Sequence, residues 1–312
     1  MNTPLVIVGP TASGKTLLSL NMAHRLHGEI ISADSRQVYK YLTIGTSKPS
    51  EEDRATAPHH FVDILDPKEV YSAGLFARQA MEKVEAVISG GRTPIVVGGS
   101  GLYIKAVVDG IFDGPAAQPE IRRRLEQRLK EEGVESLTRE LERVDQGTAA
   151  AMKAEPKPRR LIRALEVYYA TGKPLSAHHG AQTRTARFSW IQVGLDWNRP
   201  DLYKRIDQRV DRMFEAGLLE EVNWLKENGY DSRLNSLNTV GYKEVFDHLQ
   251  GTLNLADCID LVKRNTRRFA KRQLTWFRAD KRIRWIPVRG EPEWGTIADR
   301  TEDLYRKESL PS

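Results

Sequence analysis

The sequence has one cysteine and no long apolar run in its 312 residues. A single thiol, Cys258, excludes a disulfide framework and a zinc site built from cysteines. No apolar stretch approaches the roughly 18 residues that a membrane-spanning helix needs. The sequence also has no internal repeat and no low-complexity tract, and no charged segment precedes its first apolar run. We therefore expect a cytoplasmic globular protein.

Acidic residues are fewer than basic ones. Asp and Glu number 42 and Lys and Arg 48, which leaves a formal net charge of +6. This balance favours a polyanionic partner without identifying it. The hydrophobic fraction of 40% is ordinary for a globular protein. The length is sufficient for about two domains.

The most informative stretch is Gly9–Thr16, which reads GPTASGKT. It follows an apolar run, Leu5–Val8, and precedes a helical pattern of apolar residues. A strand, a glycine loop and a helix in this order predict a phosphate-binding P-loop. The amides at the helix start and the Lys15 ammonium would bind phosphate, and the Thr16 hydroxyl would hold Mg²⁺. The predicted phosphate-binding residues are Gly9, Pro10, Thr11, Ala12, Ser13, Gly14, Lys15 and Thr16.

Strands and helices alternate in the first third of the chain. Further short apolar runs lie at 29–33, 61–65 and 94–99, and helical patterns lie at 73–88 and 102–108. This order predicts an α/β fold of the P-loop NTPase type, a parallel sheet flanked by helices. Ligands gather at the carboxyl ends of such strands, so Gly9–Thr16, Asp34–Gln37 and Gly98–Gly101 should converge.

The middle of the chain shows no strand pattern. Helices are predicted at 120–132, 136–144, 148–154 and 159–171. We therefore expect an all-helical insertion domain at 113–187, between two parts of a core domain at 1–112 and 188–312. The second part should contain a strand at 188–197, an edge strand at 283–286 and helices at 200–216, 218–227, 242–248 and 255–279. The final ~15 residues are polar, and we expect them to be loose.

Four residues could act at the predicted phosphate site. Asp34 ends the second strand and is either a general base, a Mg²⁺-linked carboxylate or a helix cap. Ser100 either reaches the ligand or caps the next helix. Arg205 and Arg209 lie one turn apart beside an apolar stripe. Such arginines are surface residues with buried stems or a second clamp on a diphosphate.

Two groups of basic residues point to nucleic acid. A charge run is usually a solvated face, but the 255–279 helix has almost no balancing acids on its basic face, and a stripe of one sign suits a phosphate backbone better. The residues are Arg122, Arg123, Arg124, Arg159, Arg160 and Arg163 in the insertion, and Lys263, Arg264, Arg267, Arg268, Lys271 and Arg272 in the long helix.

Seven segments together resemble the bacterial tRNA dimethylallyltransferases, also called tRNA isopentenyltransferases. They are residues 9–16, 32–39, 44–49, 98–103, 160–166, 240–243 and 270–277. The resemblance implies transfer of a dimethylallyl group from dimethylallyl diphosphate to N6 of adenine 37, beside the tRNA anticodon. The P-loop would then hold the departing diphosphate, with Mg²⁺ near Thr16.

The resemblance also implies roles for single residues. Asp34 matches the family's base and Arg209 its diphosphate-binding arginine, while Ser100 stands where the family usually has threonine. A tRNA arm would lie between the core and the insertion of what we expect to be a monomer. The implied tRNA contacts are Ser35, Arg36, Gln37, Ser100, Arg122, Arg159, Arg160, Leu161, Ile162, Arg163, Gly241, Tyr242, Lys243, Lys271 and Arg272.

Two other functions use the same motifs. A P-loop small-molecule or nucleoside kinase would also employ Lys15, Thr16 and Asp34. Against a kinase stand the basic helix and the lack of an acidic residue at the end of the 94–99 strand. The other alternative is a nucleotide-dependent RNA-binding protein without catalysis.

Overall fold

The computed structural model describes residues 3–110, 115, 118–152, 156–180 and 188–309. The chain divides into two compact units. The core unit comprises Met1–Asp109 and Phe188–Ser312, and the insertion unit comprises Gly110–Arg187. Within the described residues, no helix is long and apolar enough to cross a membrane.

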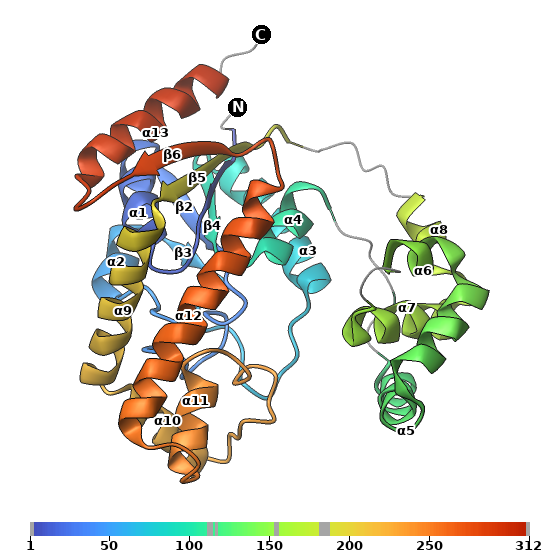
Figure 1. Ribbon diagram of the computed structural model, residues 1–312. Helices are drawn as coiled ribbons and strands as arrows, with labels where there is room; N and C mark the ends of the chain where they lie inside the picture. The colour runs from blue at the N-terminus through green and yellow to red at the C-terminus, as the bar shows by residue number, and fades with distance from the viewer. Residues whose placement is uncertain (1–2, 111–114, 116–117, 153–155, 181–187, 310–312) are drawn as a thin grey trace. The chain divides into compact units, whose positions relative to one another are not determined.

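A six-stranded sheet forms the centre of the core unit (Figure 1), with the strand order β3-β2-β4-β1-β5-β6. All its pairings are parallel; Leu5, for example, lies between Ile95 and Ile191. Parallel strands covered on both faces are apolar throughout, which explains the short apolar runs in the sequence. The strands are β1 Leu5–Val8, β2 Gly28–Ser32, β3 His59–His60, β4 Thr93–Gly98, β5 Ile191–Trp197 and β6 Arg284–Val288.

The predicted parallel sheet and edge strand are confirmed, but one predicted strand is wrong. The third strand consists of His59 and His60, whereas the apolar run at 61–65 forms turns and a single bridge. Phe61 and Asp63 have positive φ angles of 64° and 57°. Such angles are incompatible with a continuous strand.

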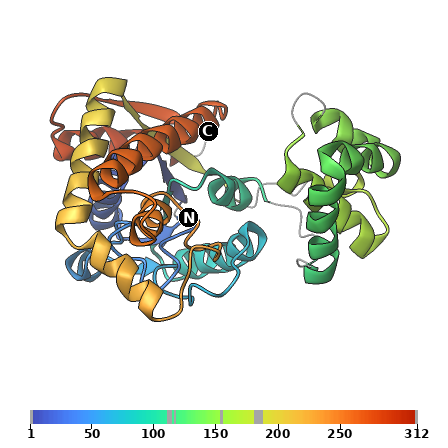
Figure 2. The same cartoon turned by 60° about the horizontal axis from the view of Figure 1, so that its bottom comes forward.

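Helices cover both faces of the sheet (Figures 1 and 2). On one face, α1 (Lys15–Arg25) and α13 (Trp294–Ser309) share a buried cluster with β1 and β5. On the other face, α3 (Ala73–Ser89) packs against α4 (Gly101–Val108). The loose C-terminus predicted from the sequence is therefore wrong for residues up to 309. The side chains of Ile297 and Tyr305 are buried, and the Tyr305 hydroxyl donates to the Thr3 carbonyl at 2.8 Å.

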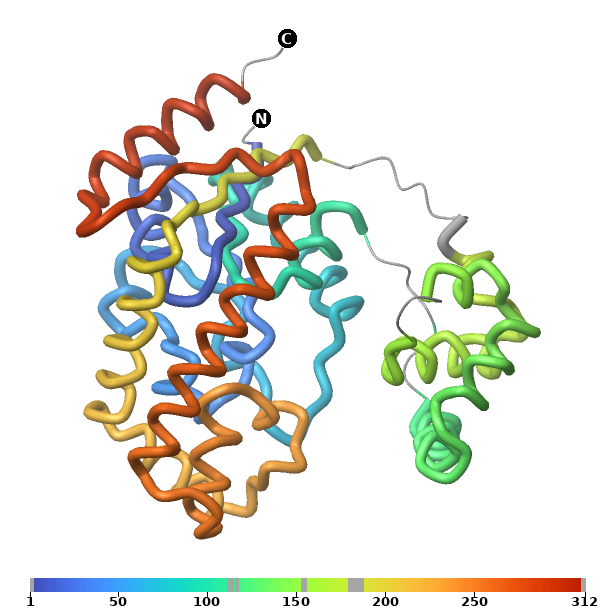
Figure 3. Tube along the Cα trace, viewed as in Figure 1, coloured from blue at the N-terminus to red at the C-terminus, as the bar shows by residue number. Residues whose placement is uncertain are grey.

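The remaining helices of the core unit lie towards the carboxyl ends of the strands. Figure 3 traces the longest of them, α12, which packs against α9 and α11. The short helix α2 has no apolar periodicity, and its start is fixed by a capping box at Ser50, so the hydrophobic pattern did not predict it. These helices are α2 Glu51–Thr56, α9 Arg199–Glu215, α10 Leu218–Glu227, α11 Tyr242–Leu249 and α12 Leu255–Arg278.

The regular elements described in the insertion unit are all helices. Its helices are α5 Pro119–Val144, α6 Gln146–Met152, α7 Pro158–Thr171 and α8 Leu175–Gly180. A break at Gly133, with φ of 80°, divides α5 where the sequence predicts two helices. Leu125, Leu141 and Leu165 form a core of their own between α5 and α7.

Candidate functional site

The three segments predicted to converge line one cavity of about 470 Å³. It lies at the carboxyl ends of β1, β2 and β4, as expected for a parallel sheet. The P-loop contributes Thr11, Lys15 and Thr16, and the two other segments contribute Asp34–Gln37 and Gly98–Ser100. The predicted convergence is therefore confirmed. Loops at 45–47 and 238–240 and side chains of α9 and α12 complete the wall.

Two side chains from other elements donate hydrogen bonds to carbonyl groups of the P-loop. The Nε1 of Trp197 donates to the Ser13 carbonyl at 3.0 Å, and the Nε of Arg205 donates to the Ala12 carbonyl at 3.1 Å. The Arg205 guanidinium also lies 4.7 Å from the centre of the Trp197 ring, a cation–π contact. Arg205 therefore supports the P-loop through its Nε.

Gly14 permits the turn from the loop into α1. Its φ of +88° lies in the left-handed region, and a Cβ added there would come within 1.8 Å of the Trp294 ring. Both constraints require glycine. Trp294 begins α13, so the C-terminal helix also supports the loop.

Gln273 joins the P-loop to the loop after β4. Its Oε1 accepts a hydrogen bond from the Thr11 amide at 2.8 Å, and its Nε2 donates to the Gly99 carbonyl at 2.9 Å. The side chain is only 7% exposed. In the sequence, Gln273 is marked only by its place in the 270–277 segment. A signal was present, because it is a polar residue in line with the buried Ala270 and Phe277 of α12.

Asp34 reaches the cavity while stabilising its own loop. Its Oδ1 accepts hydrogen bonds from the amides of Arg36 at 2.8 Å and Gln37 at 3.4 Å. Residues 35–38 form turns and no helix begins there, so the helix-cap alternative is wrong; the same oxygen stabilises the turn while Asp34 lies on the cavity wall. The Ser100 hydroxyl makes no capping bond to α4. It accepts instead from the Ser35 amide at 3.0 Å, so the capping alternative for Ser100 is wrong.

The cavity places two cations against one carboxylate. Burial and, to a lesser extent, the charge of Arg209 lower the pKa of Lys15 to about 7, against the opposing effect of Asp34. Burial also lowers the pKa of the Arg209 guanidinium, with Asp34 again opposing. The Lys15 Nζ meanwhile donates to the Pro10 carbonyl at 2.7 Å. A bound anion would relieve the repulsion between the two cations.

A second cavity, of about 530 Å³, reaches the same cations from another side. Lys15, Thr16 and Arg209 line both cavities. The second also extends to Arg205, Arg212 and the loop at 43–50. An anion held at the P-loop would therefore border both cavities.

The carboxylate of Glu221 fixes the loop that forms part of both walls. It accepts hydrogen bonds from the amides of Thr43 at 3.0 Å and Ile44 at 2.8 Å, and a longer one of 3.4 Å from Gly45. It also accepts one from the Tyr242 hydroxyl at 2.5 Å. No motif in the sequence marks Glu221, because its partners are backbone amides far away in the chain.

Three residues predicted to contact tRNA have buried side chains. Tyr242 and Leu161 are 0% exposed and Ile162 is 6% exposed. Tyr242 packs against Gly45, and the other two belong to the insertion core. An RNA contact at these three positions would therefore have to come from the backbone. The resemblance marked whole segments and did not separate contact residues from packing residues.

The other predicted contacts in the core unit, apart from the buried Gly241, face solvent or the cavity. Ser35, Arg36, Gln37 and Lys243 line the cavity, and Gly241 supports the start of α11 beside Lys243. Lys271 and Arg272 are exposed on α12. The expected lack of balancing acids is wrong for the first half of that helix. There, Lys263 pairs with Asp211 and Arg267 with Asp207, both on α9, which the sequence of α12 alone does not reveal.

In the insertion unit, a buried carboxylate organises two of the predicted arginines. Glu166 is 0% exposed and accepts from Arg122 at 2.8 Å and from Arg163 at 2.9 Å. These bonds, with one from the Gln118 amide at 2.9 Å, lower the pKa of Glu166 against the opposing effect of burial. Arg159 and Arg160 remain exposed at the start of α7.

The comparisons with known proteins agree on one family. The sequence model described as "IPP transferase" matches residues 37–280. A tRNA dimethylallyltransferase of Pelotomaculum thermopropionicum is 44% identical over 94% of this chain and 93% of its own. One of Salinibacter ruber is 47% identical over 96% and 90%.

Two solved structures are similar throughout the chain. The full-length tRNA isopentenylpyrophosphate transferase of Bacillus halodurans has a TM-score of 0.73 and 37% identity, covering 99% of this chain and 98% of its own. A eukaryotic dimethylallyltransferase acting on tRNA has a TM-score of 0.84 and 29% identity, covering 100% and 81%. The match to the family model and the identity to curated relatives together show that this chain belongs to the IPP transferase family.

Proposed function

We propose that this protein transfers a dimethylallyl group from dimethylallyl diphosphate to N6 of adenine 37 in tRNA, which gives N6-isopentenyladenosine and releases diphosphate. The observation that carries the proposal is the cavity in which the P-loop, the cations of Lys15 and Arg209, and the Asp34 carboxylate meet. The names of the relatives support a prenyl transfer to tRNA and not the kinase alternative.

The P-loop and the two cations bind the diphosphate as the leaving group. Breaking the allylic C–O bond leaves positive charge on a delocalised five-carbon fragment and negative charge on diphosphate. The amides at the start of α1 and the charges of Lys15 and Arg209 stabilise that anion. Met213, Val240 and Phe269 line the same cavity and offer apolar contacts to the allyl group.

The oxygen atoms near the loop fit a magnesium ion. Thr16 and Asp34 line one cavity and provide hydroxyl and carboxylate oxygens, the ligand type that Mg²⁺ prefers together with substrate phosphates. Thr16 would hold the ion directly. When bound, Mg²⁺ neutralises charge on the departing diphosphate.

Asp34 accepts the proton that the adenine amine loses. That amine is a weak nucleophile because its lone pair is delocalised into the ring, so a carboxylate that takes its proton during attack accelerates the reaction. The oxygen Oδ1 is fixed by two backbone amides, which keeps the carboxyl group oriented. The Ser100 hydroxyl accepts a hydrogen bond from the Ser35 amide. From the loop after β4, it contacts the reacting base.

The acceptor base must leave its stack to reach this cavity. Arg36 and Lys243 line the cavity, and the exposed Lys271 and Arg272 lie on α12, so cationic groups surround the entrance. Such groups recognise an unpaired RNA loop through its phosphates and exposed bases. A tRNA substrate also fits the cytoplasmic location that we expect from the sequence.

Incubating the protein with unmodified tRNA, dimethylallyl diphosphate and Mg²⁺ tests the proposal. After digestion, mass analysis of the nucleosides should show adenosine carrying one five-carbon unit, located at position 37. The control reaction replaces the allylic donor with ATP and should give no modified nucleoside and no phosphorylated product. Phosphoryl transfer from ATP without any prenylated adenosine would favour the kinase instead.

A further inference from the structure

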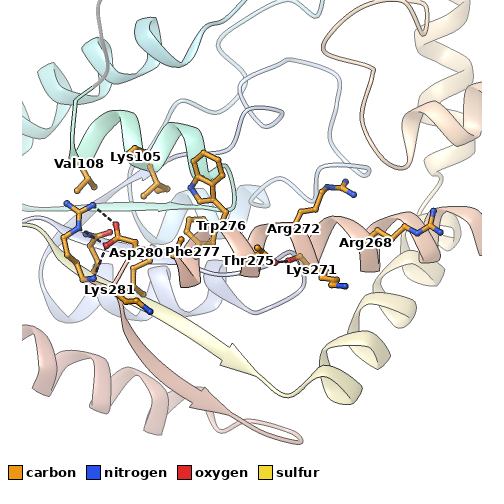
Figure 4. A pocket seen from close by; sticks show the side chains of 16 residues that line it. Lys105, Val108, Arg268, Lys271, Arg272, Thr275, Trp276, Phe277, Asp280 and Lys281 are labelled. Atoms are coloured by element: carbon orange, nitrogen blue, oxygen red, sulfur yellow. Dashed lines mark hydrogen bonds and ion pairs between the residues drawn. The ribbon is translucent and has the colours of Figure 1, made fainter. Parts of the chain in front are cut away.

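A larger cavity, of about 950 Å³, lies beside the catalytic one, between α4 and the second half of α12 (Figure 4). Apolar side chains form much of its lining, with Ile104 and Val108 from α4 and Trp276 and Phe277 from α12. The Trp276 side chain is 42% exposed, so a large flat ring faces solvent at this place. The roles proposed above use Lys271 and Arg272 at its rim but none of its apolar lining.

Cations without acidic partners surround the apolar lining. Arg268, Lys271, Arg272 and Lys281 line the cavity, and within the described chain none of them forms an ion pair with a carboxylate. The nearby carboxylates are already engaged, because Asp109 pairs with Lys105 and Arg282, and Asp280 pairs with Arg282. The rim therefore carries a net positive charge around an exposed aromatic ring.

The two cavities are adjacent, with lining residues that are shared or consecutive in the chain. Arg272 lines both of them. Ser100 lines the catalytic cavity, and the next residue, Gly101, lines the larger one. A Cβ added to Gly101 would lie 2.3 Å from Trp276 Cδ1, so the indole packs directly on the start of α4. Figure 4 shows Arg272 and Trp276 projecting from the same side of α12.

We propose that this cavity binds the unpaired nucleotide that is next to the target adenine in the RNA strand. Its base stacks on Trp276, and the phosphates that join it to its neighbours contact Arg268 and Arg272. The inference rests on the proposed function, because it needs an RNA whose adenine occupies the catalytic cavity. Consecutive nucleotides then enter adjacent cavities, and Arg272 lies where the phosphate between them must pass.

The charge pattern favours a nucleotide over an apolar ligand. A prenyl chain or an apolar peptide would leave the cationic rim without partners, whereas a nucleotide supplies a flat aromatic face and a negative phosphate together. Stacking on an exposed aromatic side chain is the usual way in which proteins hold unpaired bases. Arginine adds phosphate contacts through its forked guanidinium.

A double-mutant cycle, in which a protein substitution is combined with an abasic site in the RNA, tests the stacking. Anticodon stem-loops carry an abasic site on the 5′ or on the 3′ side of the target adenine, and their affinities are measured for wild type and for Trp276→Ala. One of the two abasic RNAs should bind wild type about 5- to 100-fold more weakly than intact RNA, the range expected for losing one stacked base. The same abasic site should lower the RNA affinity of Trp276→Ala less than twofold, because the ring on which the base stacks is already gone.

Trp224→Ala is the matched control, since Trp224 is similarly exposed at 44% but lies on α10, outside the cavity. In this variant the abasic site should lower the RNA affinity by the same factor as in wild type. Equal losses in wild type and Trp276→Ala, or no loss with either abasic RNA on wild type, would reject the nucleotide site. The second of these results needs no variant and holds even if Trp276→Ala fails to fold.

The phosphate contact has its own test on the same helix. Arg268→Ala should lower the slope of log affinity against log salt by about one, the change for one phosphate contact. Arg264→Ala removes a similar charge one turn earlier, outside this cavity, and should leave the slope nearly unchanged. Equal slopes for Arg268→Ala and wild type would contradict the contact. If wild type forms no prenylated adenosine, the proposed function itself fails; if it does and the coupling is absent, only the nucleotide site fails.

Discussion

Lys15 should take up a proton when the diphosphate donor binds. Burial, helped by Arg209, lowers the pKa of this lysine to about 7 in the free protein. A bound diphosphate supplies the negative charge that favours the ammonium, so the pKa should rise towards its ordinary value. The perturbation that isolates this effect is Lys15→Arg, because a guanidinium stays protonated throughout the accessible pH range.

The expected number of protons taken up follows from the lowered pKa of Lys15. With a pKa of about 7, roughly a tenth of the lysines carry a proton at pH 8, so binding should take up about 0.9 proton there. Near pH 6 the uptake should fall to about 0.1 proton, since the free lysine is already charged. Above pH 7 the donor affinity of wild type should therefore weaken about tenfold per pH unit, a cost of roughly 1.4 kcal/mol each. The donor's own terminal phosphate is largely ionised above pH 7 and contributes little there, whereas near pH 6 it would release protons on binding and offset the small uptake by the lysine.

Calorimetry measures this uptake directly. Titrations of dimethylallyl diphosphate at pH 8, in buffers of different ionisation enthalpy, give the number of protons taken up from the slope of the observed enthalpy. Wild type should show about 0.9 and Lys15→Arg close to zero. Equal uptake in both proteins, or donor affinity that does not change between pH 7 and 9, would refute the reasoning that Lys15 is neutral before the donor binds.

Three further changes have defined outcomes. Asp34→Asn keeps the oxygen that caps the loop but removes the base, so transfer should fall about 10²- to 10⁴-fold while RNA affinity changes little; near-normal turnover would exclude Asp34 as the base. Gln273→Leu leaves a buried amide and a buried carbonyl unpaired and should lower the free energy of unfolding by about 2–4 kcal/mol, with KM for the donor rising more than KM for RNA; unchanged denaturant unfolding would contradict this. Glu221→Gln loses charge-assisted bonds to the loop at 43–45 and should make that loop more sensitive to limited proteolysis, whereas an unaltered cleavage pattern would show that the carboxylate is dispensable.

Local sequence patterns predicted the scaffold of the site because its parts obey short-range rules. The P-loop, the strand ends and the positions of Asp34 and Ser100 follow from apolar runs that end in glycine or polar residues, and the topology of a parallel sheet brings them together. The edge strand β6 was predicted for the same reason.

The supports of the site were harder to predict because they join distant segments. Gln273 binds the Thr11 amide across 262 positions, and Trp197 binds the Ser13 carbonyl across 184. Side chains that bond to backbone groups leave no complementary residue type to search for. The helix α13 was missed for a different reason: its buried face is formed by few apolar residues, Ile297, Ala298 and Tyr305, among many charged ones.

The central claim is that the P-loop holds the diphosphate of an allylic donor while an RNA adenine receives the prenyl group. The most direct measurement follows both products in one reaction that contains tRNA, Mg²⁺, ATP and dimethylallyl diphosphate. The account predicts one diphosphate released for each prenylated adenosine formed, with ATP left intact. Phosphate released from ATP, with no diphosphate from the donor and no modified adenosine, would contradict it.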